Sequence, residues 1–350
     1  MDIINFDNCE RPSIFSQRHY GGLSGNKEHI IIDGENWFLK YPANIRGKFT
    51  NVELSYSNSP LCEYLGSKIY EFLDIPVHKT LLGISPKTGH VLVACKDFLK
   101  NGEKLDEFSQ IKVSFAPHNL DSSSSSGSSC NLRETVSIIK DNEFLKSVYG
   151  VEERFWDMFV VDAFIGNSDR NNGNWGIIRK LDGTNELSPV YDNGNSFNNK
   201  WDLGKIRLFQ SDHEKFISEA YTGKTCIFSH TEKTGEEKKL NPFKVIQSEE
   251  YEGLNEAVKR LTSKISTQFE TITNFINEIP NEAEGIPIIS DEQKHFYIDL
   301  MRTRYNKVFV PTVEKLNGRS NAADIHVNKA SLDNHDISPA KTHKKSSGWS

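Results

Sequence analysis

The chain has 350 residues, of which 36% are hydrophobic and 11% aromatic, enough for a large buried core. A formal net charge of −6 gives no sign of a nucleic-acid-binding surface, and five scattered cysteines form neither a disulfide framework nor a zinc pattern. There is no signal-peptide core and no apolar run of about 18 residues. We therefore expect a cytoplasmic protein without a membrane span, with export by a non-classical route left open.

The N-terminal part of the sequence is typical of strands with one helix. Residues 28–41 predict a hairpin that turns at Asp33–Gly34, because Asp-Gly between apolar β-formers favours a tight turn. Residues 61–74 carry apolar side chains at helical spacing. Residues 77–84 and 89–98 predict a second pair of strands.

Helical patterns dominate the rest of the chain. They cover residues 132–148, 152–166, 250–279 (with breaks) and 291–309. We therefore expect an α+β fold of two lobes, in which a small β-rich N-lobe precedes a larger α-rich C-lobe.

Three segments depart from the globular pattern. Residues 121–130 (DSSSSSGSSC) predict a flexible serine-rich insertion, and residues 222–240 predict an exposed loop. The polar residues from Arg319 onward predict a disordered tail. The expected organisation is an N-terminal extension over 1–17, the N-lobe over 18–100, the C-lobe over 101–318 and the tail over 319–350.

The densest polar motif is the segment 166–176 (GNSDRNNGNWG), which follows the apolar stretch 155–165. An ordinary turn rich in Asp and Asn is one interpretation. A calcium loop is excluded, because counting from Asp169 puts Asn174 where the EF-hand needs glycine and Lys180 where it needs glutamate.

A kinase catalytic loop is the third interpretation. Phosphoryl transfer needs a carboxylate at the attacking hydroxyl and an amide oxygen on a metal ion, and Asp169 and Asn174 have the Asp-x-x-x-x-Asn spacing of such loops. The chain that follows predicts a hairpin with its turn at Asp182–Gly183, which would return Asp192 to Asn174. Asp169 is then the candidate base, and Asn174 and Asp192 are the candidate metal ligands.

A kinase also needs a lysine that holds the ATP phosphates and a glutamate that positions this lysine. Lys40 closes a predicted strand, on the same face as Phe38 and opposite Trp37. Glu63, in the helix that follows, is the favoured partner, and Glu53 is its rival. Taken alone, Lys40 also fits a merely solvated lysine.

Two further segments fit nucleotide binding. The glycines of 21–27 (GGLSGNK) would let backbone amides approach phosphate oxygens, although plain turns have the same composition. This is not a Walker motif, since GxxxxGK[ST] is missing. The strand 91–98 (VLVACKDF) ends in a polar step between the lobes, where a kinase backbone meets adenine, although an ordinary core strand fits as well.

Together these motifs resemble the HipA-like kinases, and most of all their compact CtkA-type members. The resemblance is carried, in order, by YGGLSGNK, NWFLKYP, SPLCEYLG, VACKDF, FWDMFVVDAFIGNSDRNNGNWG and SPVYDNGNSF. It spans residues 18–310 and is most specific over 155–197. It implies a two-lobed fold related to eukaryotic protein kinases and phosphoinositide 3-kinases, with ATP and Mg²⁺ as cofactors and serine or threonine as the phosphate acceptor, often with autophosphorylation.

Carried over by position, the resemblance assigns roles to individual residues. Asp169 resembles the catalytic aspartate, and Asn174 and Asp192 resemble the magnesium ligands. The residues that it implies for ATP binding are Gly22, Ser24, Gly25, Asn26 and Lys27 of the glycine-rich loop, Lys40 with Glu63, the hinge Lys96, Asp97 and Phe98, and Asn171 and Asn172 of the catalytic loop.

The resemblance leaves the phosphate acceptor open. We expect a monomer with a protein substrate, no direct binding of nucleic acid, and room for an antitoxin-like protein partner. A kinase of a lipid or small molecule on the same fold is the first alternative. A non-catalytic ATP-binding interaction module is the second.

Overall fold

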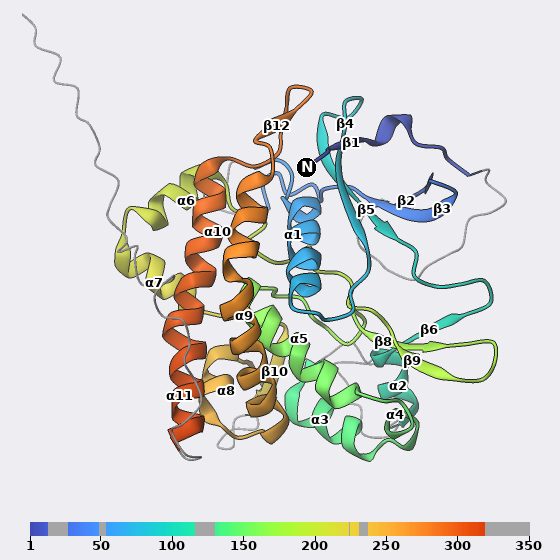
Figure 1. Cartoon of the computed structure of the whole chain (residues 1–350), viewed down its shortest axis with the longest axis vertical. Helices are drawn as coiled ribbons and strands as arrows, with labels where there is room; N and C mark the ends of the chain where they lie inside the picture. Colours follow the sequence, from blue (N-terminus) through green and yellow to red (C-terminus); the bar gives the residue numbers. More distant parts are fainter. Residues whose placement is uncertain (13–26, 49–53, 116–129, 224, 231–236, 319–350) are drawn as a thin grey trace, which may run out of the picture.

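In a computed structural model of the chain, the described residues are 1–12, 27–48, 54–115, 130–223, 225–230 and 237–318. Within them the strands of the N-terminal part lie to one side and most of the helices make up the remainder (Figure 1). The expected α+β fold, with a β-rich N-lobe before an α-rich C-lobe, is confirmed.

A five-stranded sheet in the order β1-β4-β5-β3-β2 forms the N-lobe. Its neighbouring strands run antiparallel, apart from the parallel pair of β1 and β4. Helix α1 packs against β4 and β5 (Figure 1). The elements of this lobe are β1 (Ile4–Asn5), the 3-10 turn η1 (Phe6–Asn8), β2 (Lys27–Ile32), β3 (Glu35–Lys40), α1 (Ser59–Phe72), β4 (Thr80–Ser85) and β5 (His90–Lys96).

The β2–β3 hairpin confirms the predicted turn and sets the direction of Lys40. Asp33 and Gly34 have positive φ angles of 53° and 74°, as tight hairpin turns require. Trp37 is buried in a small core on one face of the sheet. The alternation of the strand puts Lys40 on the other face, where its ammonium reaches α1.

The C-lobe is built around α5 (Val151–Ile165), in which every residue from Phe155 to Ile165 is buried. A helix that is apolar on nearly all sides belongs in the interior. The long helix α9 (Glu252–Glu278) packs along it and contributes a stripe of buried apolar residues. The C-terminal end of α5 is thereby a fixed point inside the lobe.

The remaining elements complete the C-lobe around α5 and α9. They are β6 (Lys104–Glu107), α2 (Phe108–Phe115), β7 (Cys130–Asn131), α3 (Leu132–Asp141), α4 (Glu143–Lys146), β8 (Gly176–Arg179), β9 (Asn185–Leu187), α6 (Leu203–Gln210), α7 (His213–Tyr221), β10 (Ile227–His230), β11 (Glu237–Lys239), α8 (Pro242–Ser248), β12 (Glu282–Ala283), β13 (Ile286–Pro287), α10 (Asp291–Arg304), the π-helical turn η3 (Tyr305–Phe309) and α11 (Val310–Gly318). Among the described residues, no helix combines the length and the apolar character that crossing a bilayer requires.

Several predicted bounds were wrong for identifiable reasons. The helix expected over 132–148 is divided at Asn142, whose side chain caps α4 by accepting a hydrogen bond from Leu145 N at 3.0 Å. The breaks expected within 250–279 are absent from α9, which is continuous. The helix expected to end at 309 continues through η3 into α11.

The three segments that were expected to be loops or tail need correction or lie outside the described residues. The exposed loop expected over 222–240 contains β10, which pairs with β7 and β11, a non-local pairing that composition does not reveal. Cys130, the last residue of the predicted serine-rich insertion, is buried in β7. The rest of that insertion, over 121–129, and the predicted tail over 319–350 lie outside the described residues.

Gly66 tests how closely α1 fits against the C-lobe. A Cβ at this position would lie 2.8 Å from the Cβ of Asn193. Alanine normally stabilises a helix relative to glycine by ~1 kcal/mol. Here we expect Gly66→Ala to lower the free energy of unfolding by about 1–3 kcal/mol, because a buried methyl group would be overpacked. Urea denaturation measures this difference.

The matched control is Gly318→Ala, since a Cβ at Gly318 would meet no heavy atom within 4 Å. We expect this variant to unfold at the same urea concentration as the parent chain or slightly higher. A Gly66→Ala protein that is as stable as Gly318→Ala would contradict the close fit of α1.

Candidate active site

The predicted catalytic loop begins where α5 ends. Gly166 has a φ of 71° and donates its backbone N–H to Asp162 O, which ends the helix with a left-handed residue. The guanidinium of Arg304 donates to Phe164 O at 3.0 Å and so satisfies another of the last carbonyls of α5. The loop therefore leaves a rigid helix at a fixed angle.

Asp169 is oriented by side-chain amides. Its Oδ1 accepts a hydrogen bond from Asn171 Nδ2 at 3.2 Å, and its Oδ2 accepts one from Asn195 Nδ2 at 3.0 Å. Asn174 Nδ2 donates to Asp169 O at 2.7 Å. Because its amide nitrogen is used in this way, Asn174 has its oxygen Oδ1 left as a ligand atom.

The predicted hairpin between the loop and Asp192 is confirmed as β8 and β9, with a turn at Gly183. Asp192 follows in the left-handed region, with a φ of 63°. Asp tolerates this region better than most residues do, and such a residue is often found at a functional site. The side chain of Asp192 is 46% exposed, and its Oδ1 accepts a hydrogen bond from Lys40 Nζ at 2.9 Å.

Lys40 bridges the two lobes. Its ammonium donates to Glu63 Oε2 and to Asp192 Oδ1, both at 2.9 Å. Burial alone would lower the pKa of Lys40, but the carboxylates of Asp192 and Glu63 raise it well above its usual value. Glu63 is thus the partner that the structure gives to Lys40, while the rival Glu53 lies outside the described residues.

Glu63 is an ionised carboxylate in a buried setting. Burial alone would raise its pKa, but the charge of Lys40 and hydrogen bonds from His78 and from the backbone of Asn193 lower it far below its usual value. His78 Nε2 lies 2.9 Å from Glu63 Oε1, and Asn193 N donates to the same oxygen at 3.0 Å. The Lys40–Glu63 pair is therefore fully hydrogen-bonded on the glutamate side.

Arg170, beside the candidate base, holds the two polar segments together. Its guanidinium pairs with Asp162, with Nε 2.8 Å from Oδ2, deep beneath the loop. It also donates to the carbonyl oxygens of Asn174 and Tyr191 and to Asn193 Oδ1. One side chain thus joins the loop of Asp169 to the segment of Asp192.

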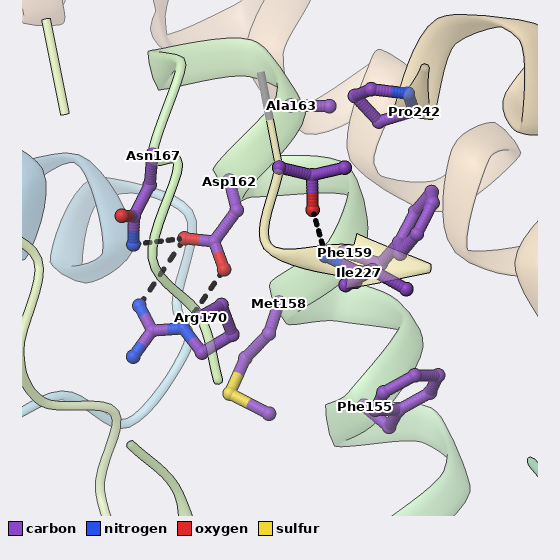
Figure 2. Close-up of a pocket in the computed structure, with 10 residues that line it drawn as sticks. Phe155, Met158, Phe159, Asp162, Ala163, Asn167, Arg170, Ile227 and Pro242 are labelled. Atoms are coloured by element: carbon purple, nitrogen blue, oxygen red, sulfur yellow. Dashed lines mark hydrogen bonds and ion pairs between the residues drawn. The ribbon is translucent and has the colours of Figure 1, made fainter. Parts of the chain in front are cut away.

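Asp162 is the anchor of this arrangement. Figure 2 shows Arg170 and Asn167 converging on its carboxylate beside a small cavity, to which α5 contributes four apolar residues. Tyr70, which lies in α1, donates its hydroxyl to Asp162 Oδ1 at 2.9 Å. Burial alone would lower the pKa of Arg170, but Asp162 raises it above its usual value.

The predicted hinge lies beside the segment of Asp192. Lys96 ends β5, and its ammonium lies 2.5 Å from Glu35 Oε2. Asp97 N donates to Asn36 O at 3.0 Å. The ring of Phe98 stacks on Tyr191 with centroids 5.7 Å apart, and Tyr191 OH donates to Gly173 O at 3.0 Å.

The other residues predicted to bind ATP either lie outside the described residues or have contacts within the protein that do not by themselves indicate a ligand. Gly22, Ser24, Gly25 and Asn26 lie outside the described residues, and the backbone of Lys27 pairs with Lys40 at the start of β2. Asn171 Oδ1 accepts a hydrogen bond from Gly173 N at 2.8 Å. Asn172 is completely buried, and its carbonyl accepts a hydrogen bond from Ser109 N. Asn172 therefore attaches the buried side of the loop to α2.

Sequence reasoning missed Asp162, Arg170, His78 and Asn193. Asp162 left one usable signal, since a single carboxylate within the apolar run FVVDAFI must be paired when it is buried. Arg170 looked like part of a polar turn. Nothing local marked His78, because its partner Glu63 lies in a different element.

The Asp162–Arg170 pair supports a stability prediction. Asp162→Asn would leave the charge of Arg170 buried without its counter-charge, so we expect the free energy of unfolding to fall by about 3–5 kcal/mol. The measurement is urea denaturation at neutral pH. Glu292→Gln is the matched control, because Glu292 pairs with Arg207 at the surface, and we expect a change within about 0.5 kcal/mol. Similar losses in both variants would contradict the anchoring role.

Comparisons with known proteins give a curated relative and matching solved structures. No protein-family model matches the chain. The chain is 28% identical over 309 residues to the serine/threonine-protein kinase CtkA of Helicobacter pylori, a match that covers 87% of this chain and 89% of that protein. The crystal structure of a proinflammatory kinase CtkA from Helicobacter pylori matches with a TM-score of 0.77 and 24% identity, over 91% of this chain and 99% of that chain.

A second solved structure is the complex of HipA, HipB and operator DNA from Shewanella oneidensis, which matches with a TM-score of 0.44 and 11% identity, over 87% of this chain and 70% of that chain. The match to CtkA confirms the predicted resemblance and the two-lobed kinase-like fold, and it supports the predicted enzyme class of a serine/threonine-protein kinase.

Proposed function

We propose that this chain is an ATP- and Mg²⁺-dependent kinase that phosphorylates serine or threonine hydroxyls of proteins, itself included. The observation that carries the proposal is the double contact of Lys40 with Glu63 and Asp192, in a site where Arg170 joins the loop of Asp169 and Asn174 to the segment of Asp192. Such an arrangement of lysine, acid and amide is what phosphoryl transfer requires of a protein.

The side chains present fit magnesium and a nucleotide. Asn174 and Asp192 offer the amide and carboxylate oxygens that Mg²⁺ prefers, and the partly exposed carboxylate of Asp192 is accessible. Lys40 offers an ammonium for phosphate oxygens. When bound, ATP supplies the phosphoryl group and Mg²⁺ neutralises its negative charge.

The roles of the protein residues follow from their contacts. The two amides that hold Asp169 fix its carboxylate as a hydrogen-bond acceptor, so that it orients an acceptor hydroxyl and takes its proton. Lys40 keeps its positive charge because its pKa is raised, and it serves as a fixed cation for phosphate oxygens. The peptide acceptor is proposed from the likeness to CtkA, a serine/threonine-protein kinase.

The first test is transfer of ³²P from ATP to the chain itself and to a generic basic protein. We expect incorporation with Mg²⁺ that falls at least about 100-fold in Asp169→Asn, because the amide cannot accept the hydroxyl proton. Asp182→Asn, at the exposed turn of the β8–β9 hairpin, is the control and should keep full activity. An inactive parent chain, or an Asp169→Asn protein with full activity, would refute the proposal.

The second test is nucleotide binding measured by thermal shift. ATP with Mg²⁺ binds the native state, so it should raise the melting temperature of the parent chain. We expect Lys40→Met to lose most of this shift, since it removes the cation for the phosphates while the other residues of the site remain. A shift in the parent chain without any phosphate transfer would favour the non-catalytic ATP-binding module, and absence of any shift would contradict ATP binding altogether. ATP turnover stimulated by a lipid or metabolite and not by protein would favour the alternative substrate class.

A further inference from the structure

We propose that His78 is a positioning residue of the ATP site, because its imidazole holds Glu63 in the orientation in which Glu63 pairs with Lys40. The proposal rests on the kinase function proposed above. It is carried by the contacts of His78, which lies between α1 and β4, outside the motifs that indicate the kinase fold.

Glu63 is 1% exposed, and its carboxylate accepts hydrogen bonds from two sets of donors. Its Oε2 accepts the hydrogen bond from Lys40. Its Oε1 is bound by His78 Nε2 at 2.9 Å and by Asn193 N at 3.0 Å. The donors at Oε1 therefore determine which way the carboxylate plane faces, and so where Oε2 meets the ammonium.

The chemistry of the carboxylate fixes the role of the imidazole. An ionised carboxylate only accepts hydrogen bonds, so Nε2 of His78 must carry the hydrogen. Ser67 Oγ lies 3.2 Å from the same nitrogen and accepts a hydrogen bond from Asn193 Nδ2 at 3.0 Å. His78, Ser67 and Asn193 thus form one network around Glu63.

His78 is itself fixed to the segment that carries Asp192. It is 5% exposed, and its backbone N–H donates to Val190 O at 2.9 Å. Val77 forms a parallel β-bridge with the same residue. Val190 lies two positions before Asp192. His78 therefore contacts Glu63 through its side chain and the segment of Asp192 through its backbone, and Glu63 and Asp192 are the two carboxylates that accept hydrogen bonds from Lys40.

A metal-ion site is the competing interpretation of this cluster. Ligand atoms of Glu63, His78 and Cys95 lie within 4.8 Å of one another, and carboxylate, imidazole and thiolate are donors that zinc accepts. However, the ammonium of Lys40 already pairs with the carboxylate of Glu63. In this buried setting its positive charge would repel a metal cation bound to the same carboxylate. The contacts therefore favour a hydrogen-bond donor over a metal ligand.

The kinetic experiment compares two replacements of His78. Glutamine keeps an N–H donor at a similar reach, whereas leucine removes the donor and keeps apolar bulk. We expect His78→Leu to lower kcat/KM for ATP by about 10-fold or more, as is usual for residues that orient a functional side chain, and His78→Gln to recover to within about threefold. Activity of His78→Leu within twofold of the parent chain, or a glutamine variant as impaired as the leucine variant, would overturn the proposal.

A double-mutant cycle separates positioning from general packing. If His78 acts through Glu63, the variant that combines His78→Leu with Glu63→Gln should lose no more kcat/KM than the worse single variant. Independent effects would multiply, which would count against the proposal. Cys95→Ala is the control within the same cluster and should keep activity within about threefold. Zinc inhibition of the parent chain that Cys95→Ala relieves would establish the metal-ion site instead.

A third measurement does not depend on kinase activity. Imidazole ¹⁵N NMR of the ligand-free protein should show His78 with its hydrogen on Nε2, and Glu63→Gln should shift that resonance. An Nε2 without hydrogen, with the hydrogen on Nδ1 alone, would contradict the contact with Glu63. A parent chain that binds ATP without transferring phosphate refutes the proposed function only, since the effect of His78→Leu on ATP affinity then decides the positioning role.

Discussion

The buried ion pair of Asp162 and Arg170 is the interaction on which the site depends. Asp162 lies in the last turn of α5, where the negative end of the helix dipole disfavours a carboxylate, so its charge needs a strong partner. Arg170 supplies that partner and keeps its remaining donors for the carbonyls of two other segments. Isolated pairs of this kind add little net stability. Here the pair gives a defined position to two loops that have almost no regular structure of their own.

Helix α1 is bound to the segment of Asp192 along much of its length. Asn58 N donates to Asn199 O at 2.7 Å, Ser196 Oγ donates to Cys62 O at 3.2 Å, and Asn193 contacts both Glu63 and Ser67. Among the described residues, these contacts from the C-lobe hold the helix that presents Glu63 to Lys40, so the ion pair of Lys40 and Glu63 depends on the position of α1.

The sequence predicted those parts of the structure that depend on local chemistry. The Asp-Gly turn, the apolar helix α5 and the spacing of Asp169 and Asn174 each have a short-range physical cause, so each could be recognised before the fold was known. The pairing of Lys40 with Glu63 was predictable only because the kinase interpretation of the catalytic loop requires a lysine and a glutamate in one site. A strand that ends in lysine does not by itself indicate a binding site or a partner for the lysine.

What the sequence could not reveal are contacts between elements far apart in the chain. The pairing of β10 with β7 joins residues on either side of α5, and no turn signal marks it. Arg170 needed the fold to show that its side chain turns inward, because an arginine in a polar loop ordinarily faces solvent. His78 was missed for the same reason, since its role depends on its contact with Glu63, which lies in another element.

The contacts of Lys40 and Asn193 also constrain how the chain folds. Lys40 and Asp192 are separated by 152 positions, and Glu63 and Asn193 by 130. Contacts this distant in sequence are slow to form, because the entropy of closing the intervening chain must be lost before they contribute any stability. The N-lobe therefore lacks some of its buried hydrogen-bond partners until the C-lobe is in place. The two lobes are accordingly expected to fold and unfold as one cooperative unit, with the contacts among Lys40, Glu63 and Asp192 among the last to form.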